Sequence, residues 1–379
     1  MNIPSVKFIV LYNNKNITSD ISKYMLSITY NDKTDGESDE IEIELEDVDA
    51  LWQNGWYPEK GANLNVILGD DHGVIKCGEF EIDEVELKGP PDTVTIRGIA
   101  SGIKNTLKTK KSDAHENKTL RQIAEKVASK NGLTVSGTVP DISIGRVTQN
   151  KETDLGFLKR ISRDYGIVFS VRGKIITFTS VYDLEKRSIS FSLDKSDLSS
   201  YSIKDKADGI INSAKISHSN AKKNQKIELD LAYQDYLDEV DSDNPSSGNE
   251  NTYISHDRAE NKQQAKAKAK AIMHLSASNH FEGSIDLQGN ILALAGNNFK
   301  LNGIGILSGK YHIKSSSHKI DKGTGYTTSC EIKRLNIPTK SQQKTVVKKK
   351  SQPKNVRVVG GFVDLKKDTL GNIDFYSKK

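Results

Sequence analysis

The chain has 379 residues, of which 35% are hydrophobic and 28% are charged. β-Branched and aromatic side chains occur throughout, which excludes wholesale disorder and predicts a folded protein of two or three domains with modest cores. The longest apolar runs, residues 8–12 and 291–295, are far shorter than the roughly 20 residues that a membrane span requires. The first residues contain no signal-peptide core, so we expect a soluble protein made in the cytoplasm.

The formal net charge of +5 is concentrated at one end of the sequence. Residues 338–379 contain 11 Lys or Arg and 3 Asp, which leaves 44 basic and 47 acidic residues in the rest of the chain. This pattern predicts a nearly neutral body and a basic C-terminal extension. Its lysines Lys348, Lys349 and Lys350 lack interleaved aromatic residues, which favours contact with an acidic partner over nucleic-acid binding.

Residues 1–100 are predicted to form a first β-rich domain. Residues 39–46 alternate between apolar side chains and glutamates, a pattern typical of a half-exposed strand. Short apolar runs recur at roughly ten-residue spacing between glycines, which favours a barrel or a sandwich. The expected strands are 6–12, 25–30, 39–46, 64–68, 79–87 and 94–99.

Residues 101–185 are predicted to form a small α+β insert domain. One helix is expected to begin at Thr119 with a capping-box pattern and to bury an apolar stripe. A second helix is expected to begin at Thr153 or Asp154, and a β-hairpin over residues 167–179 should follow it.

Residues 186–337 are predicted to form a second β-rich domain with one helix. Residues 257–276 contain AKAKAKA, which has the period of a strand, but Ala and Lys are good helix formers and poor strand formers. Propensity over twenty residues favours a helix there. The expected strands are 188–193, 210–218, 226–231, 281–287, 298–301, 309–314 and 326–335. The fold class is therefore α+β, mainly β.

The sequence offers little catalytic or metal-binding chemistry. It contains no phosphate-binding loop, GxSxG elbow or HExxH motif, and the acidic loop near Asp241 departs from the EF-hand pattern. His312 and His318 are expected to face solvent or pair locally, and Cys77 and Cys330 are expected to be reduced and mostly buried. We therefore predict no catalytic, cofactor-binding or metal-binding residues and no small-molecule substrate.

Residues 147–178 resemble the signature of the phage late control gene D family. The glycine and apolar pattern agrees in order from about residue 5 to 335, and family members are baseplate hubs of contractile tails, similar to the hub part of type VI secretion spikes. We interpret the motif residues as structural, with Leu155, Leu158 and Tyr165 on the buried face of a helix. The motif residues are Asp154, Leu155, Phe157, Leu158, Tyr165 and Gly166.

The resemblance implies two tube-like antiparallel β-barrel domains that flank the insert, in a homotrimer. Three chains with two barrels each would form a ring of six similar units under a hexameric tail tube, and the other side would accept a trimeric spike. The implied partners are a tail spike protein, a tail tube protein and other baseplate proteins. DNA would be only passing cargo, membrane insertion is not expected, and the location would be the virion tail baseplate, assembled in the host cytoplasm.

The resemblance implies a structural adapter that is not an enzyme, with a spike on a separate chain. Three alternatives stay open at this point. The chain could be the hub of a bacterial contractile injection or secretion device, or of a long flexible tail. It could be a tail-associated peptidoglycan hydrolase, which would need a Glu of raised pKa beside a second carboxylate. It could also bind nucleic acid through residues 338–379.

Overall fold

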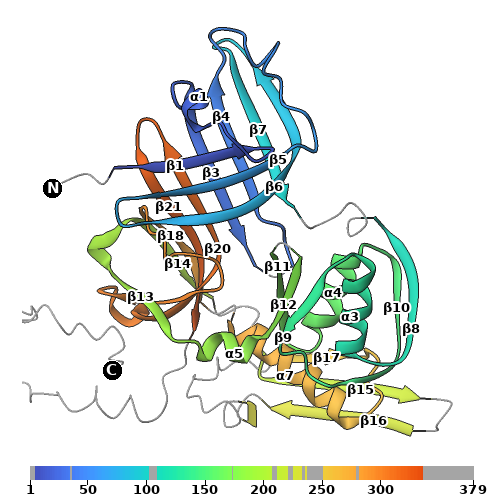
Figure 1. Ribbon diagram of the computed structural model, residues 1–379. Helices are drawn as coiled ribbons and strands as arrows, with labels where there is room; N and C mark the ends of the chain where they lie inside the picture. The colour runs from blue at the N-terminus through green and yellow to red at the C-terminus, as the bar shows by residue number, and fades with distance from the viewer. Residues whose placement is uncertain are drawn as a thin grey trace, which may run out of the picture. The chain divides into compact units, whose positions relative to one another are not determined.

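The computed structural model is mainly β, as predicted, and most of its strands belong to one 13-stranded sheet (Figure 1). The chain divides into a unit of residues 1–337 and a unit of residues 338–379. The predicted partner contacts Lys348, Lys349 and Lys350 lie outside the described residues. The structure describes residues 5–34, 36–101, 109–172, 174–206, 211–220, 225–232, 235–236, 251–278 and 281–335.

The first β unit is built by residues 7–100. In β4, Ile41, Ile43 and Leu45 are buried and the glutamates between them are half-buried, which confirms the predicted alternation. A short helix between β2 and β3 was not predicted. The elements are β1 Lys7–Tyr12, β2 Lys15–Asn16, α1 Thr18–Ser22, β3 Met25–Lys33, β4 Glu40–Glu46, β5 Asn63–Asp70, β6 Gly73–Lys88 and β7 Thr93–Ala100.

The second β unit is built by two separate stretches of the chain, 189–205 and 281–335. Its core contains Phe299, Tyr311 and Ile332, each fully buried. The strands are β13 Ile189–Asp194, β14 Leu198–Asp205, β18 Phe281–Gln288, β19 Asn298–Asn302, β20 Gly309–Asp321 and β21 Gly325–Leu335.

The two β units have the same strand order. The first runs β3-β4-β7-β6-β5-β1, and the second runs β14-β18-β21-β20, with β19 and then β13 beyond β20. The strands of the two units therefore correspond one to one in chain order: β1 to β13, β3 to β14, β4 to β18, β5 to β19, β6 to β20 and β7 to β21. One pairing differs in direction, because β1 is antiparallel to β5 whereas β13 is parallel to β19.

Matching backbone irregularities support this correspondence. Gly61 and Gly296 have φ of 83° and 90° before β5 and β19. Each donates its N–H to a carbonyl on the next long strand, Gly61 to Ile82 at 2.7 Å and Gly296 to Ile313 at 2.9 Å. An ordinary side chain is disfavoured at positive φ, so both units place glycine at the same structural position.

The two β units are joined edge to edge. Residues 27–33 of β3 pair antiparallel with residues 315–321 of β20, so both units belong to one continuous sheet. In Figure 1 the blue strands of the first unit therefore continue into the orange strands of the second. This pairing was not predicted from the sequence.

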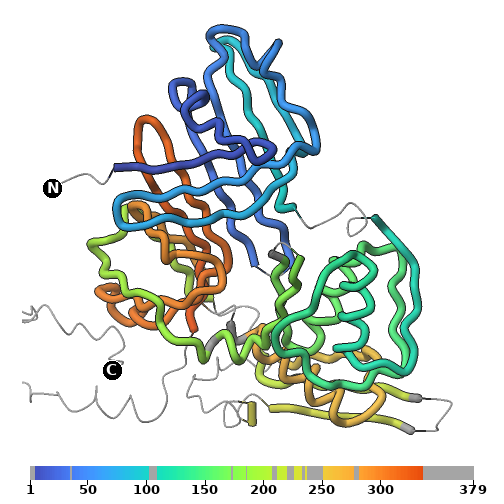
Figure 2. The backbone as a smooth tube through the Cα atoms, viewed as in Figure 1, coloured from blue at the N-terminus to red at the C-terminus, as the bar shows by residue number. Residues whose placement is uncertain are grey.

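The insert lies between β7 and β13 in the chain, and Figure 2 follows it in green. The capping box of Thr119 with Gln122 and the cap by Thr153 are confirmed. The β8–β10 pair was not predicted, because its strands are polar and lack clean alternation. The elements are β8 Lys111–Thr119, α3 Leu120–Lys130, β9 Thr134–Gly137, β10 Ser143–Glu152, α4 Asp154–Arg163, β11 Ile167–Arg172, β12 Ile175–Ser180 and α5 Val181–Lys186.

A second set of elements interrupts the second β unit between β14 and β18. Three strands form a separate sheet there, and a helix covers it with its own hydrophobic cluster. The helix includes AKAKAKA, so the helical prediction is confirmed. In the division of the chain predicted from the sequence, these residues fall within the span of the second β-rich domain, residues 186–337. The elements are β15 Ser213–Asn220, β16 Gln225–Ala232, β17 Thr252–Ser255 and α7 Lys262–Ser278.

The two cysteines and the two histidines singled out in the sequence are all buried. Cys77 and Cys330 are free thiols, as expected. His312 and His318 are 4% and 0% exposed, so they do not face solvent. They pair locally instead, which was the other alternative: His312 Nδ1 lies 2.8 Å from Asn298 Oδ1, and His318 contacts Ser316 and Tyr326.

Two further expectations concern membranes and metals. Within the described residues, no helix combines the length and apolarity needed to cross a membrane. The same part of the chain holds no group of three or more His, Cys, Asp or Glu side chains placed to bind a metal ion.

Candidate assembly surface

The border between the two β units is a buried ladder, which we call the internal seam and define as residues 27–33 of β3 and 315–321 of β20. Side chains of alternate residues from both strands enter the interior, and Ser27 at the end of the ladder is buried beside Glu44. Those 3% exposed or less are Ser27, Ile28, Tyr30, Asp32, Ser316, His318 and Ile320. The internal seam therefore buries polar as well as apolar groups.

His318 is the central polar residue of the internal seam. Its ring stacks on Tyr30 with centroids 6.2 Å apart, and its Nδ1 lies 2.9 Å from the Tyr326 hydroxyl. Its Nε2 lies 3.2 Å from Ser316 Oγ. Burial lowers the pKa of His318 to about 4, so the imidazole is neutral at pH 7.

Further hydrogen bonds tie the two β units together around the internal seam. The buried carboxylate of Asp32 accepts the Ala295 N–H at 2.9 Å. The Thr34 hydroxyl donates to the Lys314 carbonyl at 2.7 Å. Both contacts join residues more than 260 positions apart in the chain, so the internal seam is specified by side chains as well as by the backbone ladder.

The outer edge of β14 is one end of the 13-stranded sheet. Within the described residues, no strand pairs with that edge. Tyr201 is 43% exposed, and the strand carries Lys204, with Lys206 directly after it. Lys206 forms an ion pair with Glu282 of β18. This edge therefore carries two lysines, with Asp205 between them, and one exposed aromatic ring.

Within the part of the chain that the structure describes, the last part of β6 is a second open edge. Residues 84–88 pair with β7 on one side, and β5 ends its pairing with β6 at residue 81 on the other side. Leu87 is 44% exposed there. Glu84 and Glu86 lie on the same strand, 2.6 Å and 3.4 Å from nitrogen atoms of Arg97. This edge therefore carries two carboxylates, and Lys88 at its end lies 3.2 Å from Glu86.

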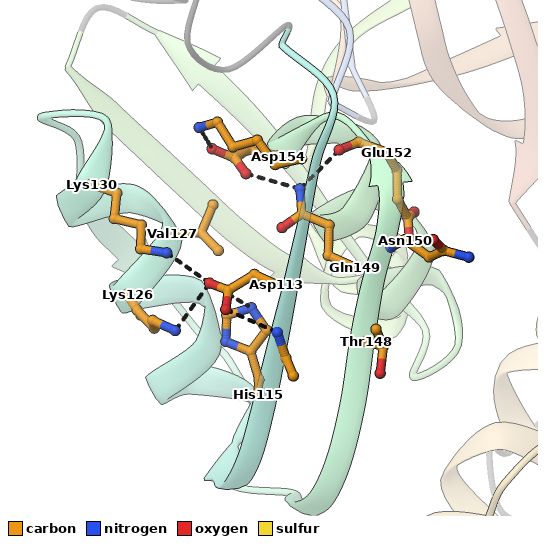
Figure 3. A network of polar contacts seen from close by, with 12 residues as sticks. Asp113, His115, Lys126, Val127, Lys130, Thr148, Gln149, Asn150, Glu152 and Asp154 are labelled. Carbon is orange, nitrogen blue, oxygen red and sulfur yellow. Dashed lines mark hydrogen bonds and ion pairs between the residues drawn. The ribbon is translucent and has the colours of Figure 1, made fainter.

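The motif residue Asp154 is a buried carboxylate within a polar network of the insert (Figure 3). Asp154 accepts hydrogen bonds from Lys111 Nζ at 2.8 Å, Asn131 Nδ2 at 2.9 Å and Gln149 Nε2 at 3.0 Å. Burial acts to raise the pKa of Asp154, but these three hydrogen bonds outweigh it and the pKa is lowered. Asp154 therefore links β8, α3 and β10 to the start of α4.

The other motif residues lie where α4 packs. Phe157 and Leu158 are fully buried in the insert core, whereas Leu155 is partly buried against it. Tyr165 is also partly buried there, but it follows the end of α4 at Arg163 and is not on the helix as expected. Gly166 is buried between α4 and β11. These positions agree with packing roles, and our interpretation of the motif as structural stays a prediction.

A neighbouring polar group joins α3 to β8 (Figure 3). Asp113 accepts from Lys126 Nζ at 3.1 Å and Lys130 Nζ at 2.7 Å. His115 is 1% exposed and stacks on Phe157 with centroids 5.2 Å apart. Burial lowers the pKa of His115, so the neutral ring belongs to the packing of the insert.

The basic face of α4 contacts the chain itself. Lys159 Nζ lies 3.3 Å from Glu37 of the first β unit, and Arg160 lies 2.6 Å from Glu152 at the end of β10. The Gly36 N–H also donates to the Phe169 carbonyl at 2.7 Å. These contacts connect the insert to the segment between β3 and β4.

One cleft gathers several carboxylates and bears on the hydrolase alternative. It is lined by Asp164, Asp257 and Glu260. Burial raises the pKa of Asp164, which lies 3.4 Å from Lys268 Nζ. Glu260 accepts the Gly145 N–H at 2.6 Å, and Asp257 accepts the Ser255 hydroxyl at 2.7 Å. Each carboxylate has a partner within the chain, and Glu260 joins the segment before α7 to the insert.

Neither the internal seam nor the two open edges were predicted from the sequence. A usable signal was present as an internal repeat. The segment GANLNV at residues 61–66 corresponds to GNNFKL at 296–301, and CGEFEI at 77–82 corresponds to SGKYHI at 308–313. In the structure these segments are the equivalent strands β5 and β19, and β6 and β20.

Comparison with curated proteins gives two phage relatives. The chain is 31% identical over 173 residues to the probable baseplate hub protein of Escherichia phage 186 and 34% identical over 173 residues to that of Escherichia phage P2. Each match covers 45% of this chain and 44% of the relative, so the similarity spans less than half of the relatives' length. No protein-family model matches the chain.

Solved structures share the fold over most of the chain. A tail protein from Neisseria meningitidis superposes with a TM-score of 0.65 at 11% identity, covering 88% of this chain and 98% of that protein. A 43 kDa tail protein of prophage MuSo2 from Shewanella oneidensis gives 0.62 at 14% identity, covering 87% and 99%. The resemblance predicted from residues 147–178 is thus confirmed: this chain is similar in sequence to phage baseplate hub proteins and has the fold of phage tail proteins.

Proposed function

We propose that this protein is a structural baseplate hub of a phage or phage-like contractile tail. In this role it is a homotrimeric adapter that joins a hexameric tail tube to a separate trimeric spike within the virion tail baseplate. Its partners are then the tube protein, the spike protein and other baseplate proteins. DNA passes through the assembly without being recognised.

The observation that carries this proposal is the shared topology of the two β units within one chain. Three copies contain six such units, so a threefold assembly can present six similar surfaces to a sixfold tube. The similarity to the phage 186 and P2 proteins supports the same role, over the 173 residues that align.

In the proposed role the protein acts through binding surfaces and not through catalysis. The contacts of Asp164, Asp257 and Glu260 support this, because each carboxylate is bound to other groups of the chain. A cell-wall clearing assay on the purified protein tests it, and we expect no clearing. Clearing that is abolished by Asp164→Asn would contradict it and favour the hydrolase.

Residues 338–379 are proposed to contact another tail protein. They carry the excess of basic residues and lie outside the described residues. We expect deletion of residues 338–379 to leave the thermal unfolding temperature of the body nearly unchanged and to weaken binding to a tail partner. A deletion variant that unfolds would contradict this. Strong, salt-dependent DNA binding by the full chain that the deletion abolishes would instead favour the nucleic-acid binder.

The direct test of the hub function is the mass of the complex with a candidate spike. The full-length protein is mixed with the small trimeric spike protein encoded beside tube and sheath genes, and native mass spectrometry measures the stoichiometry. We expect three copies of each chain. No complex, or a complex with one copy of this chain per spike trimer, would contradict the adapter role.

A further inference from the structure

Two open strand edges of this chain are equivalent to the two strands that already pair inside it. We infer that neighbouring copies join through an external seam, in which β14 of one copy pairs antiparallel with residues 84–88 of β6 of the next copy. This inference rests on the homotrimer proposed above. This external seam repeats the internal seam between β3 and β20. It requires that the two pairs of strands correspond closely.

The strand β6 corresponds to β20 residue by residue. Both pair with the following strand and shift register at one residue, Asp83 in β6 and Lys314 in β20. Gly78 and Gly309 also occupy the same position five residues before that shift. Beyond the shift, residues 315–321 of β20 pair with β3, whereas among the described strands the matching residues of β6 have only β7 as a neighbour.

The strand β14 corresponds to β3 in the same way. Both skip one residue against the next strand in the sheet, Leu26 in β3 and Ser199 in β14. Equivalent side-chain contacts follow. Ser27 donates to Glu44 as Ser200 donates to Asp286, and Lys33 pairs with Glu40 as Lys206 pairs with Glu282.

The internal seam then fixes the register of the external seam. Tyr30 is opposite His318 in the internal seam, so their equivalents Ile203 and Leu87 are opposite each other between copies. In the same register, Lys204 is opposite Glu86 and Lys206 is opposite Glu84. Because side chains alternate along a strand, the apolar pair lies on one face and both charge pairs lie on the other.

The chemistry of the two edges fits this register. Both cross-strand charge pairs join a lysine to a glutamate, and opposite charges across a ladder are stabilising whereas like charges are destabilising. Leu87 is 44% exposed in the single chain, whereas His318, its equivalent in the internal seam, is fully buried. Charges on an edge can also serve to keep strands apart, but that role does not require a lysine opposite a glutamate at both positions of one register.

The geometry of the contact also determines the kind of assembly. Each chain presents one β14 edge and one β6 edge, so the contact is head to tail and not self-complementary. A head-to-tail contact that repeats the relation between the two units of one chain continues the sheet from copy to copy. In a trimer it closes a ring in which internal and external seams alternate.

Cysteine cross-linking of the full-length protein tests the external seam. The double variant L87C/I203C places two cysteines opposite each other between copies, and the native Cys77 and Cys330 are buried. Under mild oxidation we expect disulfide-linked dimers and trimers on a non-reducing gel. The matched control L87C/S202C places its cysteines on opposite faces of the ladder, where a disulfide cannot form.

The outcomes separate the external seam from the proposed function. Cross-linking in L87C/I203C and not in the control supports the seam. A trimer by mass with no cross-link, or with equal cross-linking in both variants, would overturn the seam and leave the hub function standing. A protein that stays monomeric alone and with its spike would contradict both.

Charge reversal gives an independent readout that needs no disulfide. Lys204→Glu puts two carboxylates opposite each other, and we expect it to raise the concentration for half-assembly by at least about fivefold. The double variant K204E/E86K restores an opposite pair and should recover assembly. Failure of the double variant to recover, with unchanged thermal unfolding of each variant, would overturn the register.

Discussion

At the scale of single residues, the polar groups that hold this protein together are those whose partners are distant in sequence. Asp154 was identified from its motif, but its donors Lys111 and Asn131 lie 43 and 23 positions away. The helix caps could be predicted because they depend on residues three positions apart. The buried positions of Asp154 and His318 could not, because they depend on which strands meet.

Asp154→Asn tests the role of the buried carboxylate. The change removes the negative charge and replaces one of the two acceptor oxygens by an NH2 donor, so Lys111, Asn131 and Gln149 can no longer all be bound. We expect the free energy of unfolding to fall by about 2–4 kcal/mol. Urea unfolding measures this, with the exposed Asp141→Asn as control. A loss below about 0.5 kcal/mol, as expected for an exposed surface position, would contradict a structural role.

His318 should make stability depend on pH. Its pKa is about 4 in the folded protein and near 6.5 in an unfolded chain, so between these values only the unfolded chain binds the proton. The contribution is fully present above pH 6.5 and is lost as the pH falls towards 4. We expect a loss of about 2–3 kcal/mol between pH 7 and pH 4.5.

The measurement compares urea unfolding of the wild type and His318→Phe at both pH values. The variant should lose less stability on acidification, because phenylalanine does not titrate while it keeps an aromatic ring beside Tyr30. Other buried histidines, such as His312, contribute the same loss of stability on acidification to both proteins, so they cancel in the comparison. An identical pH dependence in the two would show that His318 does not titrate as its burial implies.

At the scale of elements, local patterns predicted the helices α3, α4 and α7 and most strands of the β units. The pair β8 and β10 was missed because KSDAHENKT and SIGRVTQNKE have few apolar residues and face solvent over much of their length. Two similar barrels were implied by the family resemblance, but local patterns did not reveal the duplication, because the equivalent strands share only scattered residues. It became visible through matching register shifts and turns.

Gly61 and Gly296 test that duplication directly. Both have positive φ at the same position of the two units, and a Cβ added at either would meet no backbone atom within 4 Å. Gly61→Ala and Gly296→Ala should therefore each cost about 1–2 kcal/mol through backbone strain alone. Gly55→Ala, which has no positive φ, should be nearly neutral in the same urea titration. A neutral effect at only one of the two positions would contradict their equivalence.

At the scale of the whole molecule, two β-rich regions around an insert could be predicted from the sequence, but not how they join. The strands β3 and β20 lie nearly 300 residues apart, and no local pattern indicates which edges meet. The internal seam fuses the two units into one sheet, and among the described strands the equivalent edges at β14 and β6 stay open. The proposed ring is the extension of this arrangement to further copies.

Electron cryomicroscopy of the purified full-length protein with its spike tests the central claim most directly. We predict a closed ring of three chains in which six β units of the common topology surround one axis. A ring with another number of chains, a twofold dimer, or a trimer in which the two β units of each chain occupy unlike positions around the axis would contradict it.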